Sequence, residues 1–236
     1  MSAIAVNPIE RAARFYDAPI GKKAVMAVTG VMLVGYVVAH MLGNLQIYSA
    51  NREQINAYAA FLHNPNNAVA LWGARTVLLA AVILHIVAAV QLWLQNRAAR
   101  PVGYFKKDDV PSSYAARTMI WSGPIVAAFV IFHVLHLTMG AVLPLHDVGG
   151  NPITPDVRYN VISGFQNYAV SGFYIFAMIL LCMHLYHGIW SLFQSLGVNH
   201  PRYTPWIQKA SAALAILVAV GNCSIPIAVA SGWLTY

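Results

Sequence analysis

Charged residues are scarce in this chain, and acidic ones are the scarcest. Only 9% of its 236 residues are charged, and Asp and Glu together number 7. Soluble domains carry about 25% charged residues, whereas 59% of this chain is hydrophobic and its mean hydropathy is +0.60. A water-soluble globular domain is therefore excluded, and the sequence predicts an integral membrane protein.

Cysteine pairs and nucleotide-binding motifs are also missing. The two cysteines, Cys182 and Cys223, both lie in apolar stretches, and no Cys-x-x-Cys-His run is present. A disulfide framework and a thioether-linked cofactor are therefore unsupported. There is no Gly-x-Gly-x-x-Gly or Walker-type loop, and the segments between the apolar stretches are too short for a nucleotide-binding domain. The chain is expected to bind neither flavin nor nicotinamide by itself.

Long apolar stretches dominate what is present. Each exceeds the ~20 residues needed to cross a ~30 Å hydrocarbon layer, and the first is too long for a signal-peptide core. The sequence predicts an all-α membrane protein, one bundle of five transmembrane helices over residues 1–236, preceded by a short interfacial helix. The predicted spans are about 24–48, 69–95, 118–143, 166–194 and 208–233.

The net charge of +7 is explained by membrane topology rather than by nucleic-acid binding. Most basic residues lie before the first span, between the second and third, and between the fourth and fifth, which are segments on one side of the membrane. Basic residues favour the cytoplasmic side, which predicts a cytoplasmic N-terminus, an external C-terminus and a multi-pass protein of the bacterial inner (cytoplasmic) membrane. The clustered residues are Arg11, Arg14, Lys22, Lys23, then Arg97, Arg100, Lys106, Lys107, Arg117, then Arg202 and Lys209.

Histidines inside the spans are the most informative residues, since an ionisable side chain in a membrane is costly and marks a functional site by default. From the cytoplasmic ends, His40 lies about 25 Å and His133 about 24 Å along their spans. His85 lies about 18 Å and His187 about 15 Å along theirs. The spans therefore carry two histidine pairs at two matching depths, one towards the outside and one towards the cytoplasm.

Two more histidines, His136 and His184, lie one helical turn from the proposed partners. His184 lies about 20 Å along its span and suits His85 almost as well as His187 does. Depth alone does not decide between the two members of each i, i+3 pair.

Haem explains paired histidines better than a bare metal ion does. Zinc needs three or four converging ligands, and the predicted spans contain no carboxylate. A porphyrin supplies four nitrogens and leaves two axial positions for imidazoles from facing helices. Iron with both axial positions filled carries electrons, so the pattern predicts two b-type haems. The alternative is that each histidine only forms a hydrogen bond between helices.

Short motifs around these histidines resemble the cytochrome b membrane-anchor subunit of succinate dehydrogenase and fumarate reductase, in its single-chain, five-helix, two-haem type. The resemblance covers nearly the whole chain in helix order and loop length. Its motifs are Thr29-Gly30 with His40-Met41 ten residues after Gly30, Gly43-Asn44, His85 with Asn96 to Pro101, Ser122-Gly123 with His133 ten residues beyond, and His187-Gly188 before Phe193 to Gly197.

The resemblance implies axial ligands and a function. It pairs His40 with His133 for the outer haem and His85 with His187 for the inner haem, with His136 and His184 as alternates or as partners of a propionate or quinone. It also implies an anchor for an iron–sulfur subunit and an FAD-carrying flavoprotein subunit in the respiratory chain. Electrons would pass from succinate to a quinone, usually menaquinone, or in reverse to fumarate. The dicarboxylate chemistry would not occur on this chain.

A quinone site requires hydrogen-bonding side chains near a membrane surface, and the sequence offers two groups of candidates. Arg75 could instead pair with a haem propionate, and Glu53 is the one acidic residue near the outer group. The outer group is Asn44, Gln46, Tyr48, His63 and Arg75, and the inner group is Trp190, Ser191 and Gln194.

Two rival functions stay open. A two-haem cytochrome b serving a hydrogenase or formate dehydrogenase would share the histidine pairs but fits the contexts of His40 and His187 less well. A haem-free transporter with a histidine proton relay would need acidic partners or broken helices at the midplane, and the predicted spans contain no Asp or Glu.

Overall fold

The computed structural model describes residues 7–99, 114–148 and 155–236. In these residues five helices are long and apolar enough to cross a membrane, as the sequence predicts. Residues 100–113, between the second and third predicted spans, lie outside the described residues. The membrane helices are α2 (Pro19–Asn44), extended by the 3-10 turn η1 (Leu45–Tyr48); α4 (Ala68–Ala98), preceded by η2 (Pro65–Asn67); α5 (Tyr114–Leu137); α7 (Tyr168–Ser195); and α8 (Thr204–Ala230).

Several helix ends differ by three to six residues from the predicted spans, including the first helix, which begins at Pro19 rather than near 24. Turn chemistry explains two of these differences. The third span ends at Leu137 rather than near 143, because Gly140 adopts a φ of +64°, a left-handed conformation that terminates helices. The fifth begins at Thr204, four residues early, since Pro205 in the first turn needs no hydrogen-bond partner for its nitrogen.

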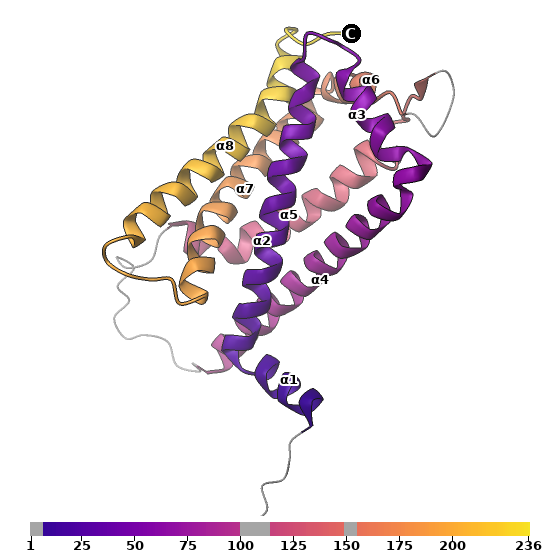
Figure 1. Cartoon of the computed structure of the whole chain (residues 1–236). Coiled ribbons are helices and arrows are strands. Elements are labelled where there is room, and N and C mark those ends of the chain that lie inside the picture. The colour runs from indigo at the N-terminus through magenta and orange to yellow at the C-terminus, as the bar shows by residue number, and fades with distance from the viewer. Residues whose placement is uncertain (1–6, 100–113, 149–154) are drawn as a thin grey trace, which may run out of the picture.

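Three short helices accompany the bundle. The predicted interfacial helix is present as α1 (Pro8–Asp17), whereas α3 (Gln54–His63) and α6 (Val157–Phe165) were not predicted. Asp156 starts α6 by accepting a hydrogen bond from the Tyr159 amide. Figure 1 shows α3, α6 and the C-terminus at one end of the bundle and α1 at the other.

The membrane helices pack in the order α4, α2, α7, α5, with α8 against α7 and α2. In the described residues, the pairs α2–α5, α4–α7 and α4–α5 are not extensively packed against each other. Taking the four helices in the order above, we call α2–α5 and α4–α7 the diagonals of the arrangement. Side chains that meet across a diagonal lie in the middle of the bundle.

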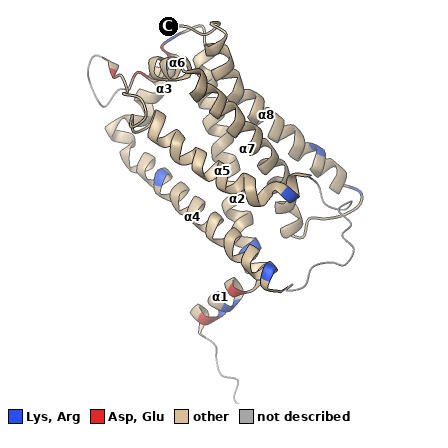
Figure 2. Cartoon of the chain, turned by 180° about the vertical axis from the view of Figure 1, so that it is seen from behind, with Lys and Arg blue, Asp and Glu red and all other residues tan. Residues whose placement is uncertain are grey.

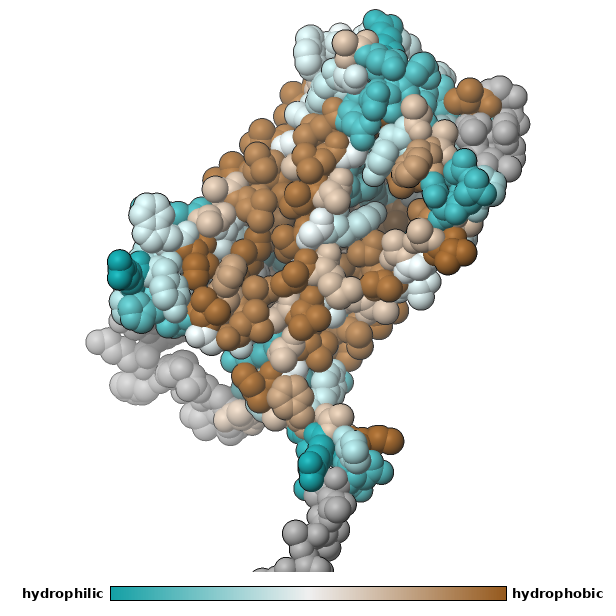
Figure 3. All heavy atoms as spheres, in the orientation of Figure 1, coloured by the Kyte–Doolittle hydropathy of each residue, from teal (hydrophilic) through white to brown (hydrophobic). Residues whose placement is uncertain are grey.

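The surface is that of a membrane protein. Large apolar side chains such as Leu79, Ile131 and Val220 are 63% exposed, and Figure 3 shows an apolar band between polar ends. Exposed Trp72 and Trp206 lie near opposite ends of the bundle, as expected of membrane-interface aromatics. Figure 2 shows Lys and Arg mostly at the end near α1 and the start of α8. The predicted orientation of the termini stays a prediction.

Candidate functional site

The histidine pair predicted to lie towards the outside, called the outer pair below, joins α2 to α5. The ring centroids of His40 and His133 lie 5.7 Å apart, with the ring planes nearly perpendicular at 88°. His40 also stacks on Tyr36 with centroids 5.5 Å apart. The two histidines that depth and resemblance place together are thus neighbours across one diagonal of the bundle.

The inner pair joins α4 to α7, across the other diagonal. Here the ring that lies beside His85 is that of His184, with centroids 6.4 Å apart and an interplanar angle of 57°. His187, which the resemblance implies as the partner, instead places Nε2 3.0 Å from the hydroxyl of Ser191 on its own helix. The geometry therefore favours the alternate, His184, because one helical turn changes which histidine faces α4.

A hydroxyl group contacts Nδ1 of one histidine in each pair. Thr29 of α2 places Oγ1 3.1 Å from Nδ1 of His85, and Tyr174 of α7 places its hydroxyl 3.2 Å from Nδ1 of His133. Histidines that bind metals usually have their second ring nitrogen held in this way. In both rings Nε2 is the nitrogen left for another partner.

The same contacts give the distance between the two levels. Thr29 and His40 are 11 residues apart on α2, about 16 Å of helix rise. Tyr174 and His184 are 10 residues apart on α7, about 15 Å. Counting along either helix therefore places the two histidine pairs about 15 Å apart along the bundle.

Glycines line the inner pair. A Cβ on Gly30 of α2 would lie 3.7 Å from Cε1 of His85, and one on Gly123 of α5 would lie 3.9 Å from Cε1 of His184. These are the glycines of the two Thr/Ser-Gly motifs seen in the sequence. The missing side chains at these two positions leave space beside Cε1 of both imidazoles.

His136 occupies a different environment from its neighbour His133. It is 1% exposed, its Nδ1 lies 2.9 Å from the Tyr174 hydroxyl, and its ring presses against Gly164 of α6. A Cβ on Gly164 would lie 2.8 Å from Nε2 of His136. The His136 ring is enclosed by protein and points at α6 rather than at α2.

The donor set fits haem on two observations. With metal–nitrogen bonds of about 2 Å and a centroid about 1 Å behind each nitrogen, two imidazoles on one iron have centroids about 6 Å apart. Both pairs have this separation. In addition, Nδ1 of His184 and Nδ1 of His187 are buried without a hydrogen-bond partner among the described residues.

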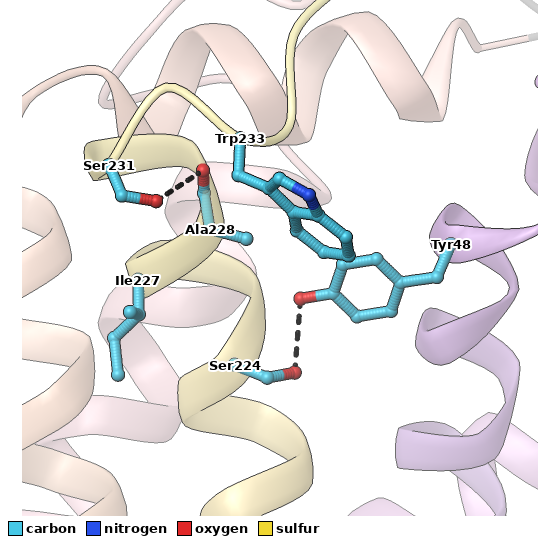
Figure 4. A pocket seen from close by; sticks show the side chains of 6 residues that line it. All are labelled: Tyr48, Ser224, Ile227, Ala228, Ser231 and Trp233. Atoms are coloured by element: carbon cyan, nitrogen blue, oxygen red, sulfur yellow. Dashed lines mark hydrogen bonds between the residues drawn. The ribbon is translucent and has the colours of Figure 1, made fainter.

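Among the predicted quinone residues, Tyr48 lines a pocket. The pocket has a volume of about 410 Å³ and lies between η1 and α8, where the Tyr48 hydroxyl donates to Ser224 Oγ at 3.1 Å and its ring lies against Trp233 (Figure 4). The rest of the lining is mostly apolar, with Ile227 and Ala228. A flat ring with a polar oxygen at its edge suits such a pocket.

The other outer candidates are separated from this pocket or engaged elsewhere. Gln46 accepts from Gln54, and His63 Nδ1 contacts the Ala59 carbonyl at 2.9 Å. Asn44 is the last residue of α2 and is half-buried.

Arg75 stacks on Trp72, with the guanidinium 4.9 Å from the ring centroid. It precedes His85 by 10 residues on α4, about 15 Å, which places it at the level of the outer pair.

The inner candidates all lie in the last turns of α7. Ser191 is bonded to His187, Trp190 is half-buried and Gln194 is exposed. The structure shows a second pocket of about 340 Å³ at this end, between α1, α2 and α4, which does not include them. Sequence reasoning missed this pocket, lined by Lys22 and Gln91, because its residues come from three elements.

Comparisons of this chain with protein-family models, with curated proteins and with solved structures gave no match.

Proposed function

We propose that this chain is the haem b-containing membrane anchor of a succinate:quinone oxidoreductase. The observation that carries the proposal is the meeting of two imidazole pairs across the two diagonals of one bundle, at levels about 15 Å apart. The sequence motifs around the same histidines, which resemble that family, supply the respiratory context.

The chain's own residues divide into two binding levels. His40 and His133 are proposed to hold the outer haem, and His85 and His184 the inner haem, with His187 as the alternate implied by the resemblance. Bound haem iron with two imidazole ligands supplies one-electron transfer. Arg75, at the outer level and without a carboxylate partner among the described residues, is proposed to pair with a propionate.

The pocket at Tyr48 is proposed as a quinone site. It lies at the end of the bundle away from α1, beyond the outer pair, and offers a phenol and a serine hydroxyl in an otherwise apolar lining. Its apolar lining suits a quinone ring, and menaquinone is the species expected from the resemblance alone. Basic residues at the α1 end are proposed to face the iron–sulfur subunit in the cytoplasm.

Haem stoichiometry on the complex purified through a tag on this chain tests the proposal. The expected result is two b-type haems per chain in a pyridine haemochrome assay, with co-purifying flavin and iron–sulfur subunits. Absence of haem would overturn the proposal and favour a haem-free transporter.

The electron donor then separates the respiratory alternatives. Succinate is expected to reduce the b-type absorbance of the purified complex, and fumarate to reoxidise it after chemical reduction. Reduction by formate or hydrogen, with no response to succinate, would instead assign the chain to a formate dehydrogenase or hydrogenase.

A further inference from the structure

The hydrogen bonds of Thr29 define which nitrogen of His85 carries the proton. Oγ1 of Thr29 lies 2.7 Å from the Val25 carbonyl and 3.2 Å from the Met26 carbonyl, and a carbonyl can only accept. The one hydroxyl hydrogen is therefore directed at the helix backbone. The oxygen can then only accept from His85, so Nδ1 carries the hydrogen and Nε2 keeps its lone pair.

Tyr174 stands between two imidazoles at the outer level. Its hydroxyl lies 3.2 Å from Nδ1 of His133 and 2.9 Å from Nδ1 of His136. A hydroxyl has a single hydrogen, so one imidazole donates to it and the other accepts from it. When Nε2 of His133 binds a metal, its Nδ1 carries a hydrogen and must be the donor. Tyr174 then donates to His136, whose burial against Gly164 holds it in place.

We propose that Thr29 and Tyr174 are positioning residues that accept hydrogen bonds from Nδ1 of His85 and His133 and so present Nε2 of each ring to haem iron. This inference rests on the proposed function. Both hydroxyls come from a helix other than the one that carries the histidine, so each fixes the rotation of the ring as well as its tautomer. Thr29 lies on α2, which supplies His40 to the outer level, and Tyr174 lies on α7, which supplies His184 to the inner level.

The hydrogen bonds have an electronic consequence. An imidazole that donates from Nδ1 is a stronger electron donor through Nε2 and favours the oxidised metal. Loss of the acceptor is therefore expected to raise the midpoint potential of the haem concerned. Each level has its own hydroxyl, so each substitution should shift the midpoint potential of one haem. The potential of the other haem should stay unchanged and serves as an internal control.

The test is a redox titration of the purified complex carrying Thr29→Val, Thr29→Ser or Tyr174→Phe. The inner and outer absorbances are first assigned with His85→Ala and His40→Ala, which are each expected to remove one haem. Thr29→Val should raise the inner potential only, Thr29→Ser should stay at the wild-type value because it keeps the hydroxyl, and Tyr174→Phe should raise the outer potential only. Loss of the inner haem in Thr29→Val but not in Thr29→Ser would support the same role.

Other outcomes overturn the inference. Unchanged potentials in both hydroxyl-free variants, with two haems still bound, would overturn it while leaving the proposed function intact. Equal effects of Val and Ser at position 29 would assign the effect to packing rather than to the hydroxyl. A wild-type complex without b-type haem would overturn the proposed function, and this inference with it.

Discussion

At the residue scale, one helical turn separates the two candidate partners of His85. His184 turns its ring towards α4, while His187 bonds to Ser191 on its own helix. We expect His184→Ala to reduce haem content from two to one per chain, because the facing axial ligand is lost. His187→Ala is expected to retain both haems, and the pyridine haemochrome assay measures each. Loss of a haem only in His187→Ala would restore the pairing implied by the sequence motif.

The contact between Gly164 and His136 gives a second prediction. An added methyl group at Gly164 would meet a rigid, buried ring at 2.8 Å, and such overpacking costs about 1–3 kcal/mol. Gly164→Ala should therefore lower the midpoint of thermal unfolding in detergent, followed by circular dichroism. Gly172→Ala is the matched control, since nothing lies within 4 Å of a Cβ there, and it should cause no loss. Equal midpoints for the two variants would contradict the tight packing.

Depth leaves both pairs open, and the motifs assign His40 with His133 and His85 with His187. In the structure the rings of His40 and His133 are neighbours, whereas the ring beside that of His85 belongs to His184. Depth along a helix does not fix the direction of a side chain, which rotates about the axis by about 100° per residue. Because the depth estimate is uncertain by one turn, it does not distinguish His184 from His187. Tyr174 was not singled out, because a lone tyrosine in an apolar span has no signal until its neighbours in space are known.

At the scale of elements, the end of the bundle away from α1 is held together by Arg158 of α6. Its guanidinium donates to the carbonyl of Ile47 at 2.9 Å and to that of Thr235 at 3.0 Å, and its amide donates to Asn56. One side chain thus links η1, the C-terminal segment and α6. The described structure therefore has a cap whose parts are distant in sequence.

Arg158→Lys should weaken this cap, because a single ammonium group cannot reproduce the two diverging hydrogen bonds. Hydrogen bonds to charged groups contribute about 2 kcal/mol, and a loss of that order is expected in the free energy of unfolding in detergent. Arg52→Lys serves as the control, since the exposed Arg52 makes one such bond, to the Tyr236 carbonyl. An equal loss in both variants would show that the two diverging hydrogen bonds of Arg158 do not account for the loss of stability.

The elements differ in how far their sequence determines them. The membrane helices follow from long apolar runs, and their revised ends follow from Gly140 and Pro205. The helices α3 and α6 were not predicted, because they have only 10 and 9 residues respectively, too few for a clear apolar period. They are stabilised instead by contacts with other elements, such as those of Arg158 and Asn56.

At the scale of the whole molecule, the distribution of Lys and Arg predicts the orientation in the membrane. Asn66, in η2 just before α4, and Asn199, before α8, are exposed. The starts of α4 and α8 lie at opposite ends of the bundle (Figure 1). With Cys182 and Cys223 replaced by Ser, a membrane-impermeant maleimide should label Asn66→Cys in intact spheroplasts. It should label Asn199→Cys only after lysis. The reverse pattern would place the N-terminus outside.

The sharing of α2 and α7 between the two levels bears on how the protein is assembled. Each of these helices supplies a ring to one level and a hydroxyl to the other, so a group bound at one level fixes the rotation of helices that the other level needs. If the chain holds two haems as proposed, their binding is coupled, and filling of either level during biogenesis should raise the affinity of the other. A ligand variant that keeps one haem, such as His184→Ala, should then release that haem more readily than the wild-type chain does.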